Sequence, residues 1–239
     1  MYLDHFGLSA LPFASMADPS FAYDAVSQCE VLDALLLALN DGAGIATVVG
    51  AAGIGKTLAC WRVAAALATA GGGERAVLLI DDAHALAPEA LLSKFEIDRP
   101  GQTQLVLFGP PELDAKLALP ALRPVANLIS FQCRLQALSR AETEQFLAHR
   151  LRMAGYRGET LFPPSIAAAV HRATRGVPRL INRVAHKSLL LAADENASRI
   201  TAGHVKAAAS RTPLTSGGLW RVAQWVDQWR ARPMRSSST

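Results

Sequence analysis

The stretch GAAGIGKT, residues 50–57, follows the apolar run IATVV at 45–49 and precedes LACWRVAAALAT at 58–69. Its first glycine, four intervening residues and final Gly-Lys-Thr match the spacing of the phosphate loop, or Walker A motif. That motif requires a strand before the loop and a helix after it, and the flanking runs predict both. The stretch therefore predicts an α/β fold in which a phosphate-binding loop follows a buried strand.

The residue types of this loop suit the binding of ATP and Mg²⁺. Its glycines let the backbone turn N–H groups toward phosphate oxygens, and the helix that follows adds the positive end of its dipole. Lys56 is expected to reach the β- and γ-phosphates, and the Thr57 hydroxyl to bind Mg²⁺. The expected nucleotide-binding residues are Gly50, Ala51, Ala52, Gly53, Ile54, Gly55, Lys56 and Thr57. The alternative is a glycine turn that a lysine follows by chance.

A second apolar run, AVLLI at 76–80, ends in two adjacent carboxylates. In P-loop enzymes a strand of this kind ends in an aspartate that holds Mg²⁺, and a nearby residue orients the attacking water. We therefore assign Asp81 to Mg²⁺ and Asp82 to the orientation of the water. The alternative is an acidic turn after a core strand.

The first part of the chain has the pattern of an α/β domain. Residues 26–40 predict an amphipathic helix, and apolar runs at 104–109 and 126–135 predict two further strands. We therefore assign residues 1–138 to a nucleotide-binding core with a parallel sheet.

After residue 138 the pattern becomes helical. Ser139 and Glu142 have the spacing of a capping box, and further helical runs follow. We assign residues 139–211 to a small all-helical lid domain, and residues 212–239 to a basic, Trp-rich tail. The tail suits either a membrane interface or a partner groove, or else packs on the lid of its own chain.

Composition narrows the class of protein. The 239 residues carry a net charge of +4, and the basic excess lies after residue 138. This basic region suits an anionic partner, and the alternative is an ordinary solvated surface. No apolar run is long enough to span a membrane, and the start does not resemble a signal peptide. We expect a cytoplasmic location, with peripheral contact at the inner membrane through the tail left open. Three dispersed cysteines argue against a disulfide framework or a zinc site.

Nearly the whole chain resembles the AAA+ ATPases of the ExeA/GspA type, which serve general secretion and MSHA-pilus biogenesis. The resemblance rests on MYLDHFGLSALPF, GAAGIGKT, LLIDDAHALAPEAL, FGPPEL, LQALSRAETEQFLAHRLRMAG, GVPRLINRVAHKSLLLAA and RITAGHVKAAA. It implies an ATPase with an α/β core and a helical lid that helps protein partners to assemble a secretion or pilus machine. It also implies that Arg179, in GVPR, reaches the γ-phosphate from the lid and takes part in catalysis.

One departure from the family concerns the fold. Only 18 residues separate Thr57 from Ala76, and the phosphate-loop helix uses most of them, so one βα unit that relatives have is missing. In the family that strand lies at the edge of the sheet, so we expect the central strands that carry the two motifs to remain paired. The new edge is expected to be covered or blunted, because an open edge invites pairing with another chain.

Three other departures concern catalysis. Relatives have glutamate where this chain has the shorter Asp82, and a glutamine where Pro110 offers no side-chain hydrogen bond. The basic residues that relatives carry before the next strand are replaced by VANLI at 125–129, which leaves Arg123 as the nearest candidate for an arginine finger toward a neighbouring subunit. These departures predict ATP binding with slow hydrolysis.

Three functions remain open at this point. The first is an ATPase that assists the assembly of a secretion or pilus machine, and the second is a nucleotide-binding switch or scaffold with little turnover. The third, a DNA-associated ATPase resembling transposition regulators, ranks last because no basic groove with interleaved aromatic residues is evident. A homo-oligomer is compatible with all three.

Overall fold

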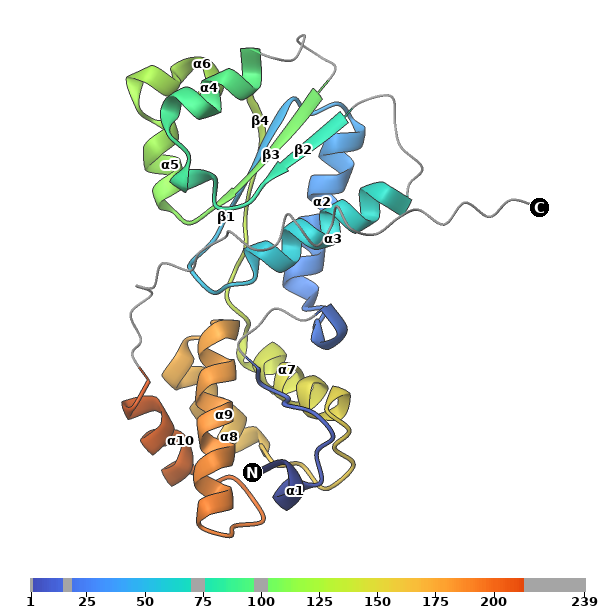
Figure 1. Ribbon diagram of the computed structural model, residues 1–239, viewed down its shortest axis with the longest axis vertical. Helices are drawn as coiled ribbons and strands as arrows, with labels where there is room; N and C mark the ends of the chain where they lie inside the picture. Colours follow the sequence, from blue (N-terminus) through green and yellow to red (C-terminus); the bar gives the residue numbers. More distant parts are fainter. Residues whose placement is uncertain (1, 15–18, 70–75, 97–102, 213–239) are drawn as a thin grey trace, which may run out of the picture.

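The protein is described by a computed structural model that covers residues 2–14, 19–69, 76–96 and 103–212. Figure 1 shows an α/β core above an all-helical lid. The basic, Trp-rich tail falls, from residue 213 on, outside the described residues. In the described parts of the chain, no helix combines the length and the apolar character needed to cross a membrane.

Within the described residues, the core is built on a parallel sheet of four strands in the order β2-β3-β1-β4. The strands are β1 (Ile45–Val49), β2 (Ala76–Ile80), β3 (Thr103–Gly109) and β4 (Ile129–Arg134). Every residue of β1 is buried, and so is nearly all of β3, because both are central and covered on both faces. The predicted parallel α/β core is confirmed.

Helices cover both faces of this sheet (Figure 1). One face packs against α2 (Val26–Asn40) and α3 (Lys56–Thr69). The other face packs against α4 (Pro88–Glu96), α5 (Glu112–Leu117), η3 (Pro120–Leu122) and α6 (Arg123–Ala126). Since successive strand residues point to opposite faces, Val48 belongs to the first cluster and Val49 to the second. This alternation decides which layer of helices each strand residue contacts. The carboxyl ends of the strands lie on the side of the core nearer the lid (Figure 1).

Strand β2, which carries the second motif, lies at the edge of the sheet. The expectation that both motif-bearing strands are central is therefore wrong for β2. Among the described residues it pairs with β3 only, and Leu78 is 36% exposed. The cause is the short connection between α3 and β2, which leaves no room for the strand that would cover this edge.

The lid consists of helices whose starts and ends agree with the local sequence. They are α7 (Arg140–Met153), α8 (Pro164–Thr174), α9 (Pro178–Asp194) and α10 (Ala202–Ser210). The predicted capping box is present, since Glu142 N donates to Ser139 Oγ at 3.1 Å and Ser139 N donates to Glu142 Oε2 at 2.8 Å. Gly155 ends α7 with a φ of 85°, a conformation that favours glycine.

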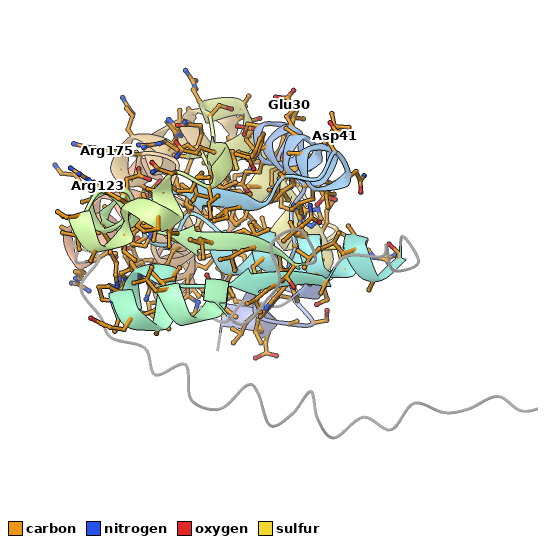
Figure 2. The ribbon with its side chains drawn as sticks, turned by 90° about the horizontal axis from the view of Figure 1, so that it is seen from above. Glu30, Asp41, Arg123 and Arg175 are labelled. Atoms are coloured by element: carbon orange, nitrogen blue, oxygen red, sulfur yellow. The ribbon has the colours of Figure 1, made fainter. Side chains whose placement is uncertain are left out.

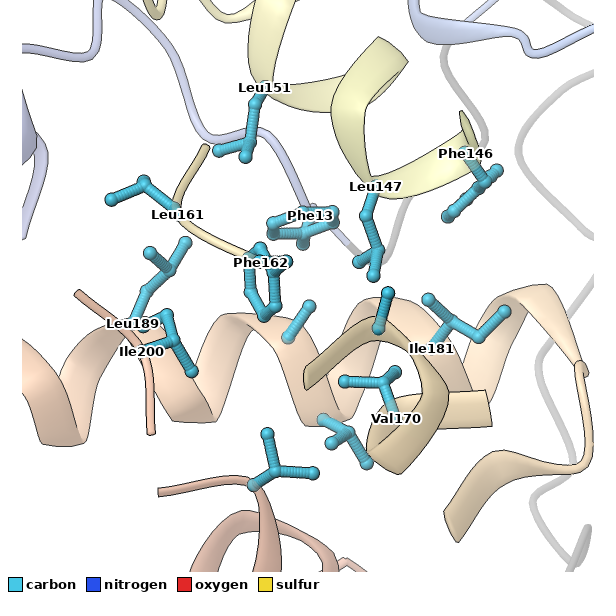
Figure 3. Packing of buried hydrophobic residues seen from close by; sticks show 14 of the residues in the cluster. Phe13, Phe146, Leu147, Leu151, Leu161, Phe162, Val170, Ile181, Leu189 and Ile200 are labelled. Atoms are coloured by element: carbon cyan, nitrogen blue, oxygen red, sulfur yellow. The ribbon is translucent and has the colours of Figure 1, made fainter. Parts of the chain in front are cut away.

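The amino-terminal segment packs on the lid, although it precedes the core in sequence. It contains α1 (Tyr2–Phe6) and η1 (Pro19–Phe21). Phe13 is 2% exposed and packs edge to face on Phe162, with 6.0 Å between the two ring centroids (Figure 3). Arg150 of α7 is 6% exposed and donates from Nε to Pro12 O at 2.6 Å. Packing therefore groups this segment with the lid, whereas the sequence division placed it with residues 1–138.

Candidate nucleotide-binding site

The loop between β1 and α3 has the backbone shape that its glycines predict. Gly53 and Gly55 have φ values of 80° and 112°, which residues with a side chain rarely adopt. Gly50 N donates to Gly109 O at 3.1 Å, so the loop starts in register with the end of β3. A Cβ on Gly50 would lie 2.9 Å from the Ile54 side chain. Glycine is therefore required at these positions for the loop to curl at the carboxyl edge of the sheet.

Lys56 begins α3 and is only 8% exposed, which is unusual for a charged side chain. Its ammonium donates to Gly50 O at 3.0 Å and to Ala51 O at 3.2 Å, which are both uncharged acceptors. Burial lowers the pKa of Lys56, although the charges of Asp82, Asp81 and Glu112 act in the opposite direction. A phosphate group in the loop would compensate this buried charge, so the residues fit a nucleotide.

Thr57 and Asp81 meet at the start of α3. The Thr57 hydroxyl donates to Asp81 Oδ2 at 2.6 Å, although the two residues belong to different elements. The other oxygen, Oδ1, accepts from Asp82 N at 3.0 Å, which fixes the carboxylate. Hydroxyl and carboxylate oxygens are hard ligands of the kind that Mg²⁺ prefers, so this pair fits the ion.

Asp82 has a left-handed backbone, with φ 50° and ψ 40°, directly after β2. Asp is one of the few residue types with a side chain that tolerates this conformation. The turn places Oδ1 of Asp82 3.9 Å from Nδ1 of His84. Its charge also acts on Lys56, so Asp82 lies near the phosphate loop. Its role in orienting water stays a prediction.

The end of β3 supplies Pro110 and a carboxylate that sequence analysis did not single out. Pro110 directly follows Gly109, the neighbour of Gly50, and has no hydrogen-bonding side chain. Two residues on, Glu112 opens α5, and its charge opposes the larger effect of burial, which lowers the pKa of Lys56. Its signal in the sequence was its place just after the strand, in the segment FGPPEL.

Arg179 lies where the lid meets the phosphate loop. Its backbone N–H donates to Gly53 O at 3.2 Å, across more than a hundred residues of chain. A Cβ on Gly53 would lie 2.6 Å from the Cβ of Arg179, so the loop and the first turn of α9 are in close contact. The Arg179 side chain is exposed. This position is compatible with the predicted reach toward a γ-phosphate.

Arg123 lies at the other end of the core. It opens α6, which runs into β4, and β4 starts with Ile129 beside Ile45 at the amino end of β1. The phosphate loop follows the carboxyl end of β1, and Figure 1 shows α6 on the side of the core away from the lid. The Arg123 side chain points outward, as does that of Arg175 (Figure 2). Arg123 is thus separated from the loop of its own chain by the length of the sheet.

The sheet order, the loop and the helical lid define the class: the chain has the fold of the AAA+ P-loop ATPases. The ORC2 protein of Aeropyrum pernix in its ADP form matches 84% of this chain with 72% of its own, at a TM-score of 0.62 and 15% identity. The RuvB Holliday junction branch migration motor of Thermotoga maritima matches 84% of this chain with 73% of its own, at a TM-score of 0.57 and 19% identity. This likeness is one of fold.

The sequence is similar to General secretion pathway protein A of Aeromonas hydrophila, with 28% identity over 95% of this chain. This confirms the resemblance to ATPases of the ExeA/GspA type. The chain spans 51% of the length of that relative. The aligned stretch of 281 positions exceeds the 239 residues of this chain, so the alignment contains gaps in this chain. No family model matches the chain.

Proposed function

We propose that this protein binds ATP with Mg²⁺ and hydrolyses the nucleotide slowly. The observation that carries the proposal is the buried ammonium of Lys56 inside a glycine-shaped loop, next to the bonded pair Thr57 and Asp81. A cation, a ring of backbone donors and two hard oxygen ligands are the parts that P-loop proteins use for a nucleotide and its metal.

Each residue has one task in this proposal. Lys56 holds the β- and γ-phosphates, and the Thr57 hydroxyl and Asp81 hold the ion. Mg²⁺, when bound, neutralises charge that develops on the phosphoryl oxygens. Asp82 orients the attacking water, and Arg179 approaches the γ-phosphate from the lid. The support for this role of Arg179 is the hydrogen bond from its backbone N–H to Gly53 of the loop.

The proposal of slow hydrolysis follows from the residues expected to act on the γ-phosphate only during the reaction. The carboxylate of Asp82 is one methylene shorter than the glutamate of relatives, and misplacement by about 1 Å can cost roughly a hundredfold in rate. Pro110 cannot donate or accept through its side chain. Arg123, the candidate for an arginine finger toward a neighbouring subunit, lies far from the loop of its own chain, so an isolated molecule gains no finger from it.

In the cell we propose that the protein assists the assembly of a secretion or pilus machine from the cytoplasmic side of the inner membrane. The support is the similarity to General secretion pathway protein A along 95% of this chain. Deleting the gene should then block the export or the surface assembly of a component of that machine. Complementation with Lys56→Ala should fail, and full complementation by this variant would contradict a role that depends on nucleotide.

A nucleotide-driven switch is the second candidate, favoured by the contact between Arg179 and Gly53. A nucleotide that moves this loop would also move α9, so binding alone could set the position of the lid. The deciding experiment measures MgATP binding and turnover on the same sample of the whole protein. Binding with no turnover under any condition favours the switch, slow turnover favours the ATPase, and absence of binding contradicts both.

A further inference from the structure

Glu142 joins the lid to the core through both oxygens of one carboxylate. Its Oε2 accepts from Ser139 N at 2.8 Å and so completes the capping box at the start of α7. Its Oε1 accepts from Ser27 N at 3.2 Å and from Ser27 Oγ at 2.7 Å. Ser27 belongs to the first turn of α2 in the core, 115 residues away in sequence.

The contact supplies a cap that α2 lacks in its own sequence. The N-cap residue of α2 is Ala25, which forms no side-chain cap hydrogen bond. The first N–H groups of a helix have no partner inside the helix and need an outside acceptor. The Glu142 carboxylate provides this acceptor for Ser27 N and also places negative charge at the positive end of the α2 dipole.

The carboxylate is held in its charged form. Burial acts against the charge of Glu142, but the hydrogen bonds from Ser139 and Ser27 outweigh it, so the pKa of Glu142 is lowered. Tyr23, the ionisable side chain beside it, donates from its hydroxyl to Gln145 of α7 at 2.7 Å. The segment around the start of α2 and the first turns of α7 are thus joined by several hydrogen bonds.

The start of α2 also contacts the phosphate loop. Gln28, the residue after Ser27, donates from Nε2 to Ile54 O at 3.2 Å. The preceding carbonyl, Gly53 O, accepts from Arg179 N of the lid. Two successive carbonyls of the loop are therefore held from outside, one by α2 and one by α9. The position of α9 relative to α2 depends on how the lid is fixed to α2, and this position sets where the two carbonyls are held.

We infer that Glu142 is a positioning residue for nucleotide binding: by capping α2 and α7 together, it fixes the lid so that Arg179 and Gln28 hold the phosphate loop in its binding shape. The inference rests on the nucleotide binding proposed above. Loss of the bond to Ser27 should weaken the binding of MgATP even where the lid helices stay intact.

Glu142→Gln separates the two tasks of this carboxylate. Glutamine still serves in a capping box, but its amide has one acceptor oxygen and cannot accept from both Ser139 N and Ser27 N. Ser27→Ala is a second variant that leaves the capping box unchanged. Ser139→Ala is the matched control, because it removes the side-chain cap of α7 and leaves the bond to Ser27 in place.

The test compares MgATP affinity by calorimetry with melting temperature for the whole protein. We expect Glu142→Gln to weaken affinity about tenfold, within the usual range of coupling between sites, and Ser27→Ala to weaken it less. Ser139→Ala should lower the melting temperature and leave affinity unchanged. The inference is overturned if affinity follows the melting temperature in all three variants, since that is the result of a merely structural role.

Hydrogen exchange of the nucleotide-free protein separates this inference from the proposed function. Glu142→Gln should speed exchange in residues 26–30 and 50–57, whereas Ser139→Ala should do so only near the start of α7. Failure of the wild-type protein to bind MgATP would contradict the proposed function. Unchanged exchange of the loop in Glu142→Gln would overturn the role of Glu142 by itself.

Discussion

The two halves of the nucleotide site differ in how completely they are built. The half that binds, from Gly50 to Thr57 with Asp81, has its glycine conformations, its buried cation and its bonded pair of oxygen ligands in place. The half that would act on the γ-phosphate has a short carboxylate at Asp82 and an inert side chain at Pro110. Although Asp81 and Asp82 both follow β2, the two halves rest on different side chains, so substitutions can test the proposed binding and the proposed hydrolysis separately.

The largest expected effect is on the binding half. Lys56→Ala removes a buried cation that faces the phosphates, so we expect the affinity for MgATP to fall by roughly a hundredfold. Calorimetry measures the effect, and Lys206→Ala, which removes an exposed lysine of α10, is the control. Equal affinity of Lys56→Ala and wild-type protein would remove the assignment of the phosphate loop.

Asp81→Ala is expected to abolish the turnover that depends on Mg²⁺. Without this carboxylate, the Thr57 hydroxyl loses its bonded partner and the ion loses a charged ligand. Turnover is measured against Mg²⁺ concentration, and Asp33→Ala on the exposed side of α2 serves as the control. A normal Mg²⁺ dependence in the variant would show that the ion is held elsewhere.

Binding should also weaken at alkaline pH. Burial lowers the pKa of Lys56 below its ordinary 10.5 in the free protein, whereas bound phosphate favours the charged ammonium. At pH values above the lowered pKa, binding must therefore take up a proton, and the dissociation constant rises about tenfold per pH unit. Lys56→Arg keeps its charge and should show a flat profile. A flat profile for the wild-type protein would contradict the assigned role of this ammonium.

The smallest effect is expected in the catalytic half. Asp82→Glu restores the missing methylene, and we expect turnover to rise about fivefold, a small part of what positioning can contribute. Affinity for MgATP should not change, since the binding half is untouched. Asp33→Glu makes the same chemical change at an exposed site. Turnover near 1 per second in the unmodified protein, an ordinary enzyme rate, would mean that the catalytic half is complete as it stands.

Local patterns predicted most of the elements. The helix expected over residues 26–40 is present as α2 (Val26–Asn40), and the capping box of Ser139 and Glu142 is present as predicted. These features depend on residues close together in sequence, where spacing and capping chemistry can be read directly.

The features that sequence analysis missed are contacts between distant residues. Burial of Phe13 in the lid depends on Phe162, and the bond from Glu142 to Ser27 spans 115 residues. No spacing rule connects such pairs. The edge position of β2 was missed for another reason: the absence of a βα unit was noticed, but not that β2 would lose its outer neighbour.

The edge position of β2 has a consequence for partial unfolding. A strand with one neighbour can separate from the sheet at a lower cost than a central strand, without breaking the pairing of β1 with β3 and β4. Because Asp81 directly follows β2 and the phosphate loop directly follows β1, such an opening would release the carboxylate that we propose for Mg²⁺ while Lys56 keeps its place. Under the proposed roles, fraying of this one short strand would weaken the hold on the ion without releasing the nucleotide.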